Sequence, residues 1–417
     1  MEPTLSSPSK SQLTKKKKIA FTLVAALFLL LFLELIARFF LNNNGAISIA
    51  ERKNDFEPYQ NKPWTEQYFK DEAACGEQRK VGSATSSFAR YLIYDAGWPE
   101  CHTPTINHLD GTRRKTWNPE YDLAKPGLKV YEVAFFGGST VQGAGVPDDL
   151  TIPSFFSRLT NTTTTDVVYH VENYGVSGYT YTQAVMKLIL LLREGKKFDY
   201  VVMYNGANDI DNAYEAGEVG AIYGEKTVES RLYEGLSGQI KEKFKEQLGA
   251  CGLCRLVITA SRHTPILKDY LTPFLIQVRK ALLFKEGASK SEDTLAPFAE
   301  GIAKNYIDSH MLLDHLAWAY GFKYFDFWQP ALHYEDGPVG GEKLYWSIDN
   351  RLTDEKLKSL FRLTLDDVLK AKLTNFYDLS LALADRTKAY YLDAVHISDD
   401  GNEAIARRII EVFDKKK

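Results

Sequence analysis

Two short segments of the sequence carry a serine and a histidine in settings that suit nucleophilic catalysis. Gly137-Gly138-Ser139-Thr140 follows an apolar run, and a serine at the start of a helix lies beside backbone N–H groups that can stabilise negative charge. Asp393-Ala394-Val395-His396 lies near the C-terminus, and an aspartate three residues ahead of a histidine can hold Nδ1–H and leave Nε2 as a base. Each segment also has an ordinary interpretation: an N-cap serine in a glycine turn, or two unrelated loop residues.

Two further turns could supply groups that bind a developing negative charge. Residues 173–178 read Asn-Tyr-Gly-Val-Ser-Gly, and their glycines would let backbone amides approach a ligand closely. Residues 205–209 read Asn-Gly-Ala-Asn-Asp, which could aim an asparagine side-chain amide into the same crevice. A plain glycine turn and an Asx turn or N-cap are the alternatives.

Strands alternate with helices from about residue 130 onward, and three of these turns each follow a strand. Strand-like runs lie at residues 130–136, 166–171, 199–204, 323–328 and 375–379. Such alternation predicts an α/β fold with parallel strands, right-handed crossovers and helices on both faces. Ligands bind at the carboxyl ends of the strands in sheets of this kind, so we expect the turns to meet there.

The order and form of the four segments resemble the SGNH/GDSL hydrolase superfamily, whose blocks are a Gly-x-Ser turn, an Asn-x-x-x-x-Gly turn, a Gly-x-Asn-Asp loop and a late Asp-x-x-His. The resemblance covers the chain from about residue 130 to its C-terminus, without much of residues 210–300. Together with the strand pattern, it implies a flavodoxin-like three-layer sandwich with a five-stranded parallel sheet. The apolar run near the N-terminus separately predicts one transmembrane helix before this fold. One departure is Gly138, which stands where the family usually has an acidic residue.

The resemblance also implies a role for each matching residue. Ser139 would be the nucleophile, His396 the general base and acid, and Asp393 the residue that orients the imidazole. The Ser139 amide, the Gly178 amide and the Asn208 side chain would form the oxyanion hole. A serine hydroxyl needs such a base, because it is a poor nucleophile until its proton is taken. No cofactor and no metal ion are expected.

Other residues have weaker claims to a function. Tyr179, just after the Gly178 turn, and Gln329, at a strand end, are possible substrate contacts. Arg113, Arg114 and Lys115 are interpreted as a solvated turn rather than an anion site.

The N-terminal region has the pattern of a membrane anchor. Lys15 to Lys18 precede residues 19–41, which are almost wholly apolar and long enough, at about 1.5 Å per residue, to cross the hydrocarbon core. The lysines predict a cytoplasmic tail at 1–18 and an exported remainder, with a bacterial inner membrane and periplasm as the default location. A cleaved signal peptide is the alternative. Residues 42–128 would form a stem, and 129–417 the hydrolase domain with a helical insertion at about 210–300.

The composition narrows the class of protein. The 417 residues carry 51 basic and 54 acidic side chains, a net charge of −3, which argues against a general nucleic-acid binder. Four cysteines are too few for a disulfide scaffold. In an oxidising compartment they could pair locally, as Cys75–Cys101 and Cys251–Cys254, although an even count leaves other pairings open.

We therefore interpret the chain as a membrane-tethered serine esterase that removes acyl groups, acetyl foremost, from a carbohydrate or another envelope ester. Its partners would be the lipid bilayer, through one helix, and that ester. An O-acyltransferase that uses the same serine, histidine and aspartate to acylate a polysaccharide is one alternative. A non-catalytic glycan-binding or assembly protein is another.

Overall fold

The structure, a computed structural model of the chain, describes residues 56–81, 87–89, 91–95, 101–109, 113–162, 166–223, 225, 292–343 and 351–417. The expected basic tail and anchor (1–41), the Cys251–Cys254 pair and most of the expected helical insertion lie outside these residues. Within the part of the chain that is described, no helix combines the length and the apolar character needed to cross a bilayer.

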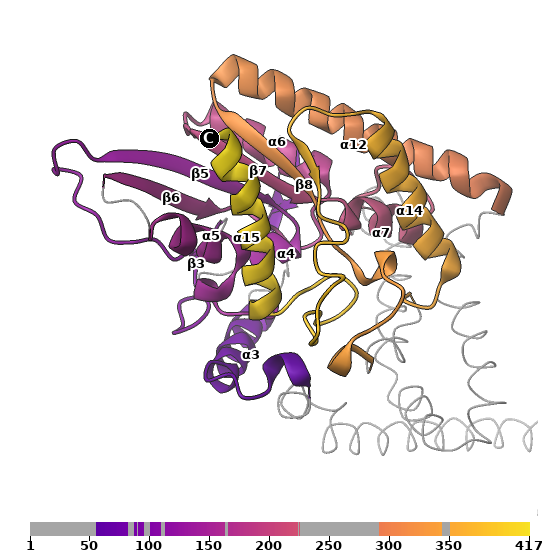
Figure 1. The fold of residues 1–417 in the computed structure, drawn as a ribbon, viewed down its shortest axis with the longest axis horizontal. Coiled ribbons are helices and arrows are strands. Elements are labelled where there is room, and N and C mark those ends of the chain that lie inside the picture. The colour runs from indigo at the N-terminus through magenta and orange to yellow at the C-terminus, as the bar shows by residue number, and fades with distance from the viewer. Residues whose placement is uncertain are drawn as a thin grey trace, which may run out of the picture. The chain divides into compact units, whose positions relative to one another are not determined.

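A seven-stranded, mostly parallel sheet forms the centre of the domain, with the order β3-β4-β6-β5-β7-β8-β9 (Figure 1). Its five parallel strands are β5 (Lys129–Gly137), β6 (Val167–Asn173), β7 (Tyr200–Asn205), β8 (Lys323–Trp328) and β9 (Phe376–Asp378). These coincide with the five predicted strands. Numbered along the chain, their order across the sheet is 2-1-3-4-5, which is the flavodoxin-like order.

The prediction of a five-stranded sheet was wrong by two strands at one edge. β4 (Arg113–Arg114) pairs antiparallel with β6, and β3 (His108–Leu109) pairs antiparallel with β4. Each has only two residues, too few for the alternating pattern that identifies a strand in a sequence. Both come from the segment expected to be a stem. A separate two-stranded sheet, β1 (Ser87–Ala89) with β2 (Ile93–Asp95), precedes them.

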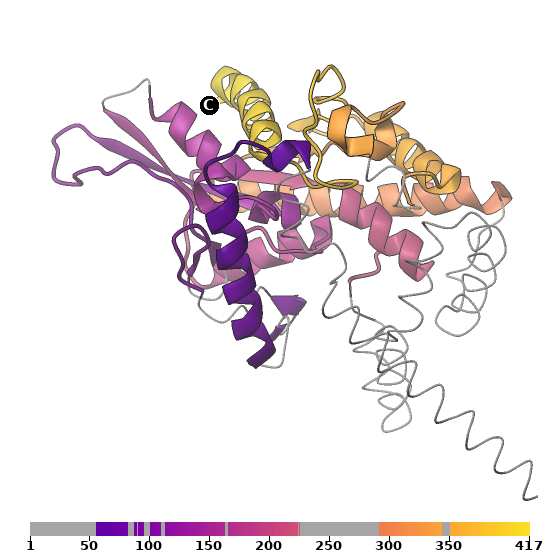
Figure 2. The same cartoon turned by 90° about the horizontal axis from the view of Figure 1, so that it is seen from below.

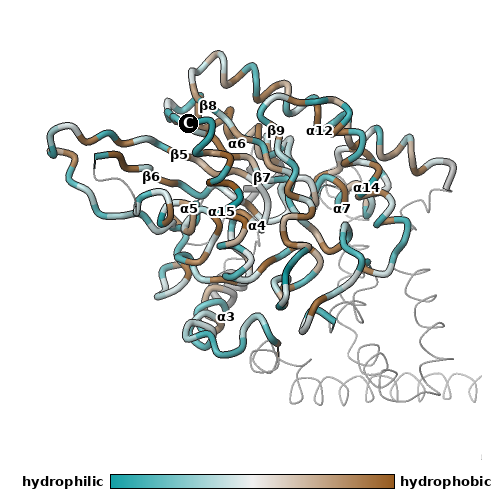
Figure 3. The backbone as a smooth tube through the Cα atoms, in the orientation of Figure 1, coloured by the Kyte–Doolittle hydropathy of each residue, from teal (hydrophilic) through white to brown (hydrophobic). Residues whose placement is uncertain are grey.

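Helices cover both faces of the central sheet (Figures 1 and 2). Residues of α5 (Ile152–Thr160) and α15 (Asp399–Lys416) share one buried cluster with Val133 and Phe135 of β5. The other cluster joins Ala134 and Phe136, on the opposite face of the same strand, to four helices: α6 (Tyr181–Arg193), α7 (Ala207–Ala216), α12 (Glu292–Tyr320) and α14 (Glu355–Lys370). Successive side chains of a strand point to opposite faces, which explains this alternation. The changes of hydropathy along the chain can be followed in Figure 3.

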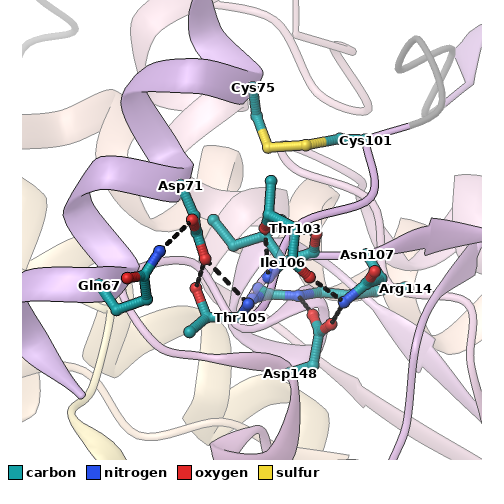
Figure 4. Close-up of a disulfide and its surroundings, with 10 residues drawn as sticks. All are labelled: Gln67, Asp71, Cys75, Cys101, Thr103, Thr105, Ile106, Asn107, Arg114 and Asp148. Carbon is teal, nitrogen blue, oxygen red and sulfur yellow. Dashed lines mark hydrogen bonds and ion pairs between the residues drawn. A yellow bond between two sulfur atoms is a disulfide. The ribbon is translucent and has the colours of Figure 1, made fainter. Parts of the chain in front are cut away.

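The described residues before the sheet form a structured layer. The short helix η1 (Glu57–Tyr59) leads into α3 (Thr65–Val81), and Cys75 of α3 is joined to Cys101 by a disulfide (Figure 4). Asp71 of α3 accepts hydrogen bonds from both the backbone N–H (2.9 Å) and the hydroxyl (2.6 Å) of Thr105. This layer is therefore attached to the domain at several points.

Arg114 is buried, which corrects the interpretation of residues 113–115 as a solvated turn. Its side chain is 5% exposed and its Nε donates to Asp148 Oδ1 at 2.7 Å (Figure 4). The guanidinium also donates to the carbonyls of Gln142 (3.0 Å) and Val146 (2.6 Å). Arg114 thus fixes the loop that follows the Ser139 turn. A run of basic residues in a sequence does not reveal such a partner.

Replacing Arg114 by methionine should strongly destabilise the domain. Asp148 would stay buried without its cation, and breaking a buried ion pair in this way costs about 3–5 kcal/mol. Urea unfolding of the variant, followed by circular dichroism, measures the change. Arg407→Met, which removes an exposed ion pair with Glu403, is the control and should change stability by less than about 1 kcal/mol. An Arg114→Met variant as stable as the control would contradict this account.

Candidate active site

Ser139 begins α4 (Ser139–Gln142), directly after the carboxyl end of β5. The chain leaves β5 toward β6 on one side of the sheet and later returns to β7 on the other side. The carboxyl ends of β5 and β7 therefore flank the point at which the strand order reverses, which is where ligands bind in open α/β sheets. Ser139 is 6% exposed, so its hydroxyl lies within the protein surface and not on a protruding loop.

The structure brings Ser139, His396 and Asp393 together in one hydrogen-bonded series. His396 Nε2 lies 2.6 Å from Ser139 Oγ, and His396 Nδ1 lies 2.6 Å from Asp393 Oδ2. The other carboxylate oxygen of Asp393 accepts the backbone N–H groups of Val395 (2.9 Å) and His396 (2.8 Å). Backbone N–H groups of the same turn thus fix the Asp393 carboxylate, and the carboxylate fixes the orientation of the imidazole.

A small hairpin carries this aspartate and histidine. Tyr391 pairs with Ile397 in an antiparallel bridge, and the N–H of Leu392 donates to the His396 carbonyl at 2.7 Å. Ser398 then caps α15 with its side chain, so the hairpin ends in a fixed helix. We call residues 390–398 the catalytic-base hairpin. Its closure brings Asp393 back to His396 Nδ1, while His396 Nε2 contacts Ser139.

The electrostatics of the pair favour a charged aspartate and a basic histidine. Burial alone would raise the pKa of Asp393, but the charge and hydrogen bonds of His396 and two backbone N–H groups lower it to about 2. Burial lowers the pKa of His396, but the charge and hydrogen bond of Asp393 raise it by more. The pKa of His396 therefore lies above the ordinary 6.5. An imidazole with this environment can take a proton from the serine hydroxyl.

The two candidate oxyanion-binding turns lie beside Ser139. Asn208, the second residue of α7, donates from Nδ2 to the carbonyl of Tyr179 at 2.9 Å. A Cβ placed on Gly138 would lie 2.3 Å from the same nitrogen, so the amide is packed directly against the residue before Ser139. The turn at Gly178 has φ of +79°, which favours glycine, and its carbonyl accepts Asn212 Nδ2 at 3.2 Å.

Neighbouring polar residues of these turns have structural partners. Asn173 donates from Nδ2 to the Val141 carbonyl at 2.8 Å and so ties the end of β6 to α4. Asp209 accepts the N–H of Tyr181 with both oxygens, at 3.0 and 3.2 Å, which joins α7 to the start of α6. Burial raises the pKa of Asp209 to about 7. These contacts hold the turns that carry Gly178 and Asn208 in place.

Tyr179 and Gln329, the possible substrate contacts, are both buried. Tyr179 is 1% exposed, packs edge-on against Tyr94 and donates its hydroxyl to the Tyr94 carbonyl at 3.0 Å. Gln329 is 3% exposed, and its N–H donates to the carbonyl of Asn205 at 2.9 Å. Tyr94 belongs to the segment expected to be a stem, and a sequence gives no sign that this segment would cover the Gly178 turn.

Among the described residues, no group of three or more His, Cys, Asp or Glu side chains is placed to hold a metal ion. The arrangement of Ser139, His396 and Asp393 suits acyl transfer through a serine nucleophile.

Solved structures with some likeness to this chain come from esterases and lipolytic proteins. A lipolytic protein of the G-D-S-L family from Veillonella parvula is 12% identical, with 68% of this chain and 98% of that chain covered and a TM-score of 0.35. An acetylxylan esterase from Geobacillus stearothermophilus is 13% identical, with 69% of this chain and 95% of that chain covered and a TM-score of 0.33. A lipase/acylhydrolase from Enterococcus faecalis is 12% identical, with 69% of this chain and 96% of that chain covered and a TM-score of 0.32. A search of curated proteins finds no match by sequence.

A family model gives the decisive comparison. The model of the GDSL-like lipase/acylhydrolase family matches residues 133–409, which include the C-terminal part of β5, the Ser139 turn and the catalytic-base hairpin. This match spans well over half of the chain, and the chain therefore belongs to the GDSL-like lipase/acylhydrolase family of serine ester hydrolases.

Proposed function

We propose that the chain hydrolyses an ester through an acyl-enzyme formed on Ser139. The observation that carries this proposal is the continuous hydrogen-bonded series from Asp393 through His396 to Ser139 Oγ. A purely structural histidine does not need a serine hydroxyl at 2.6 Å on one nitrogen and a carboxylate at 2.6 Å on the other.

The first half of the reaction would acylate the serine. His396 Nε2 takes the Ser139 proton as Oγ attacks the ester carbonyl, and the negative charge on the tetrahedral oxygen is met by hydrogen-bond donors. These are the amides of Ser139 and Gly178 and the Asn208 side chain. Asn208 Nδ2 has two protons, so the bond to the Tyr179 carbonyl leaves one for the oxyanion. The protonated His396 then gives its proton to the departing alcohol.

The second half would release the acid. His396 takes a proton from water, the resulting hydroxide attacks the acyl carbonyl, and the proton returns to Ser139 Oγ as the carboxylic acid leaves. Asp393 stays ionised throughout, because its pKa is about 2. Its charge stabilises the imidazolium that forms in each half.

The substrate and the location belong to the same proposal. An acetyl group on a carbohydrate, or another ester of the cell envelope, is the proposed substrate, and residues 19–41 would tether the domain to the outer side of a bacterial inner membrane. The Cys75–Cys101 disulfide supports an exported domain, since disulfides persist in oxidising compartments.

Fluorophosphonate labelling of the full chain in detergent tests the nucleophile. The wild type should be labelled, Ser139→Ala should not, and its hydrolysis of an aryl acetate should fall by at least about 10³-fold. Ser309→Ala, a buried serine of α12 that bonds to Thr182, is the matched control and should be labelled like the wild type. Labelling of Ser139→Ala would show that another residue reacts and would refute the assignment.

Hydrolysis and transfer can be separated with the same protein. Acetylated xylan supplied alone and together with an unacetylated oligosaccharide should release acetate at the same rate if water is the acceptor. Acetate release that falls while acetylated oligosaccharide accumulates would instead establish the acyltransferase.

The rate of labelling should also depend on pH in a defined direction. His396 acts as a base only when neutral, and Asp393 raises its pKa above 6.5, so the rate should fall as the pH drops, with a midpoint above 6.5. Asp393→Asn removes the charge that raises the pKa, so the midpoint of the residual rate should move to lower pH. Labelling rates measured between pH 4 and 9 decide this. A midpoint below 6.5, or one that is the same in Asp393→Asn, would contradict it.

A further inference from the structure

The segment at residues 56–71 contacts the loop behind the nucleophile. Tyr59 donates its hydroxyl to the carbonyl of Gly145 at 3.3 Å, and the Tyr68 hydroxyl accepts the Gly145 N–H at 3.0 Å. Gly145 lies three residues after the end of α4, which Ser139 begins. Both main-chain groups of this glycine are thus bonded to the same N-terminal segment.

The same segment contacts the chain on both sides of the catalytic-base hairpin. Before the hairpin, Glu57 Oε1 accepts the N–H of Ala389 at 3.2 Å. After it, Lys62 Nζ lies 2.9 Å from Asp399 Oδ2 and 2.8 Å from Asp400 Oδ2, in the first turn of α15. The hairpin between these contacts carries the aspartate and the histidine.

Glu57 is also connected to the buried network beneath the hairpin. Its second oxygen accepts the N–H of Gly341 at 2.6 Å. The next residue, Glu342, is fully buried and accepts the N–H groups of Tyr390 (2.8 Å) and Tyr391 (2.9 Å) with one oxygen. Arg386 binds Glu342 from Nε at 2.9 Å, so this carboxylate has a cation beside it. The start of the hairpin therefore rests on Glu342, and Glu57 holds the turn that presents Glu342.

Lys62 balances a concentration of negative charge at the end of the hairpin. The side chains of Lys62 and Asp399 are 22% and 12% exposed, so solvent screens this pair less than an ion pair on the open surface. Trp64 Nε1 also donates to Asp399 Oδ2, at 3.3 Å, and Lys388 reaches Asp400 at 2.9 Å. Without Lys62, Asp400 would keep Lys388, but Asp399 would lose its ion pair with Lys62 just three residues after His396.

We propose that Glu57 and Lys62 are positioning residues for the catalytic base: through the segment 56–71 they hold the catalytic-base hairpin in register with the loop behind Ser139. The proposal rests on the proposed function, because it assigns these residues to the His396–Ser139 geometry. Neither residue touches the reacting atoms. A displacement of about 1 Å between base and nucleophile can cost about 10²-fold in rate, so loss of both contacts should act on the chemical step.

Steady-state kinetics on an aryl acetate test the proposal with the full chain in detergent. Glu57→Gln/Lys62→Met should lose about 10- to 100-fold in kcat while KM changes less than about twofold. Lys62→Met alone should be slower than the wild type, and Lys62→Arg, which keeps the charge, should recover most of the rate that Lys62→Met loses. The matched control is Lys70→Met, which removes an exposed ion pair with Glu66 in the same segment and should keep the wild-type kcat.

Thermal unfolding of the same samples separates positioning from loss of folded protein. A double variant that is fully folded at the assay temperature and still slow supports the proposal. A double variant with the wild-type kcat per folded molecule overturns the proposal. A Lys62→Arg variant that is as slow as Lys62→Met also overturns it. A wild-type chain that neither hydrolyses the ester nor reacts with fluorophosphonate refutes the proposed function itself, a result distinct from slow variants of an active enzyme.

Discussion

The hydrogen bond between His396 Nε2 and Ser139 Oγ joins residues that are 257 positions apart in the chain. Sheet topology places Ser139, because the reversal of strand order after β5 leaves this serine at an open carboxyl edge. His396 is placed by the catalytic-base hairpin, which belongs to no strand of that sheet. Buried contacts outside the sheet therefore have to place the histidine, and the segment at residues 56–71 makes several of them.

Gly138 shows how closely the nucleophile turn is packed. The family usually has an acidic residue at this position, and here a Cβ would lie 2.3 Å from Asn208 Nδ2. The glycine lets the asparagine amide approach the Ser139 turn, while Asn173 and Asp209 hold the neighbouring turns from behind. The departure from the family pattern is thus accommodated within the site and leaves the serine, histidine and aspartate in contact.

Much of the fold and the site could be predicted from the sequence because both rest on local patterns. The five parallel strands are apolar runs of ordinary length, and the turns that contain Ser139, Gly178, Asn208 and His396 carry recognisable residue types. The two-residue strands β3 and β4, the burial of Tyr179 and the Arg114–Asp148 pair could not be predicted. β4, Tyr179 and Arg114 each depend on a partner far away in the sequence, and β3 pairs with β4. Neither the hydropathy pattern nor the residue type indicates which distant partner that is.

The ion pair between Lys62 and Asp399 closes a loop of 337 residues. Closing so long a loop has an entropic cost, and domains dominated by such non-local contacts fold slowly. During synthesis the segment at residues 56–71 is made long before Ala389 and Asp399, with which it bonds. Until Ala389 and Asp399 have been made, this segment can bond only to earlier partners such as Gly145 and Gly341. Ser139 likewise meets its base only after His396, 257 positions later in the chain, has been made.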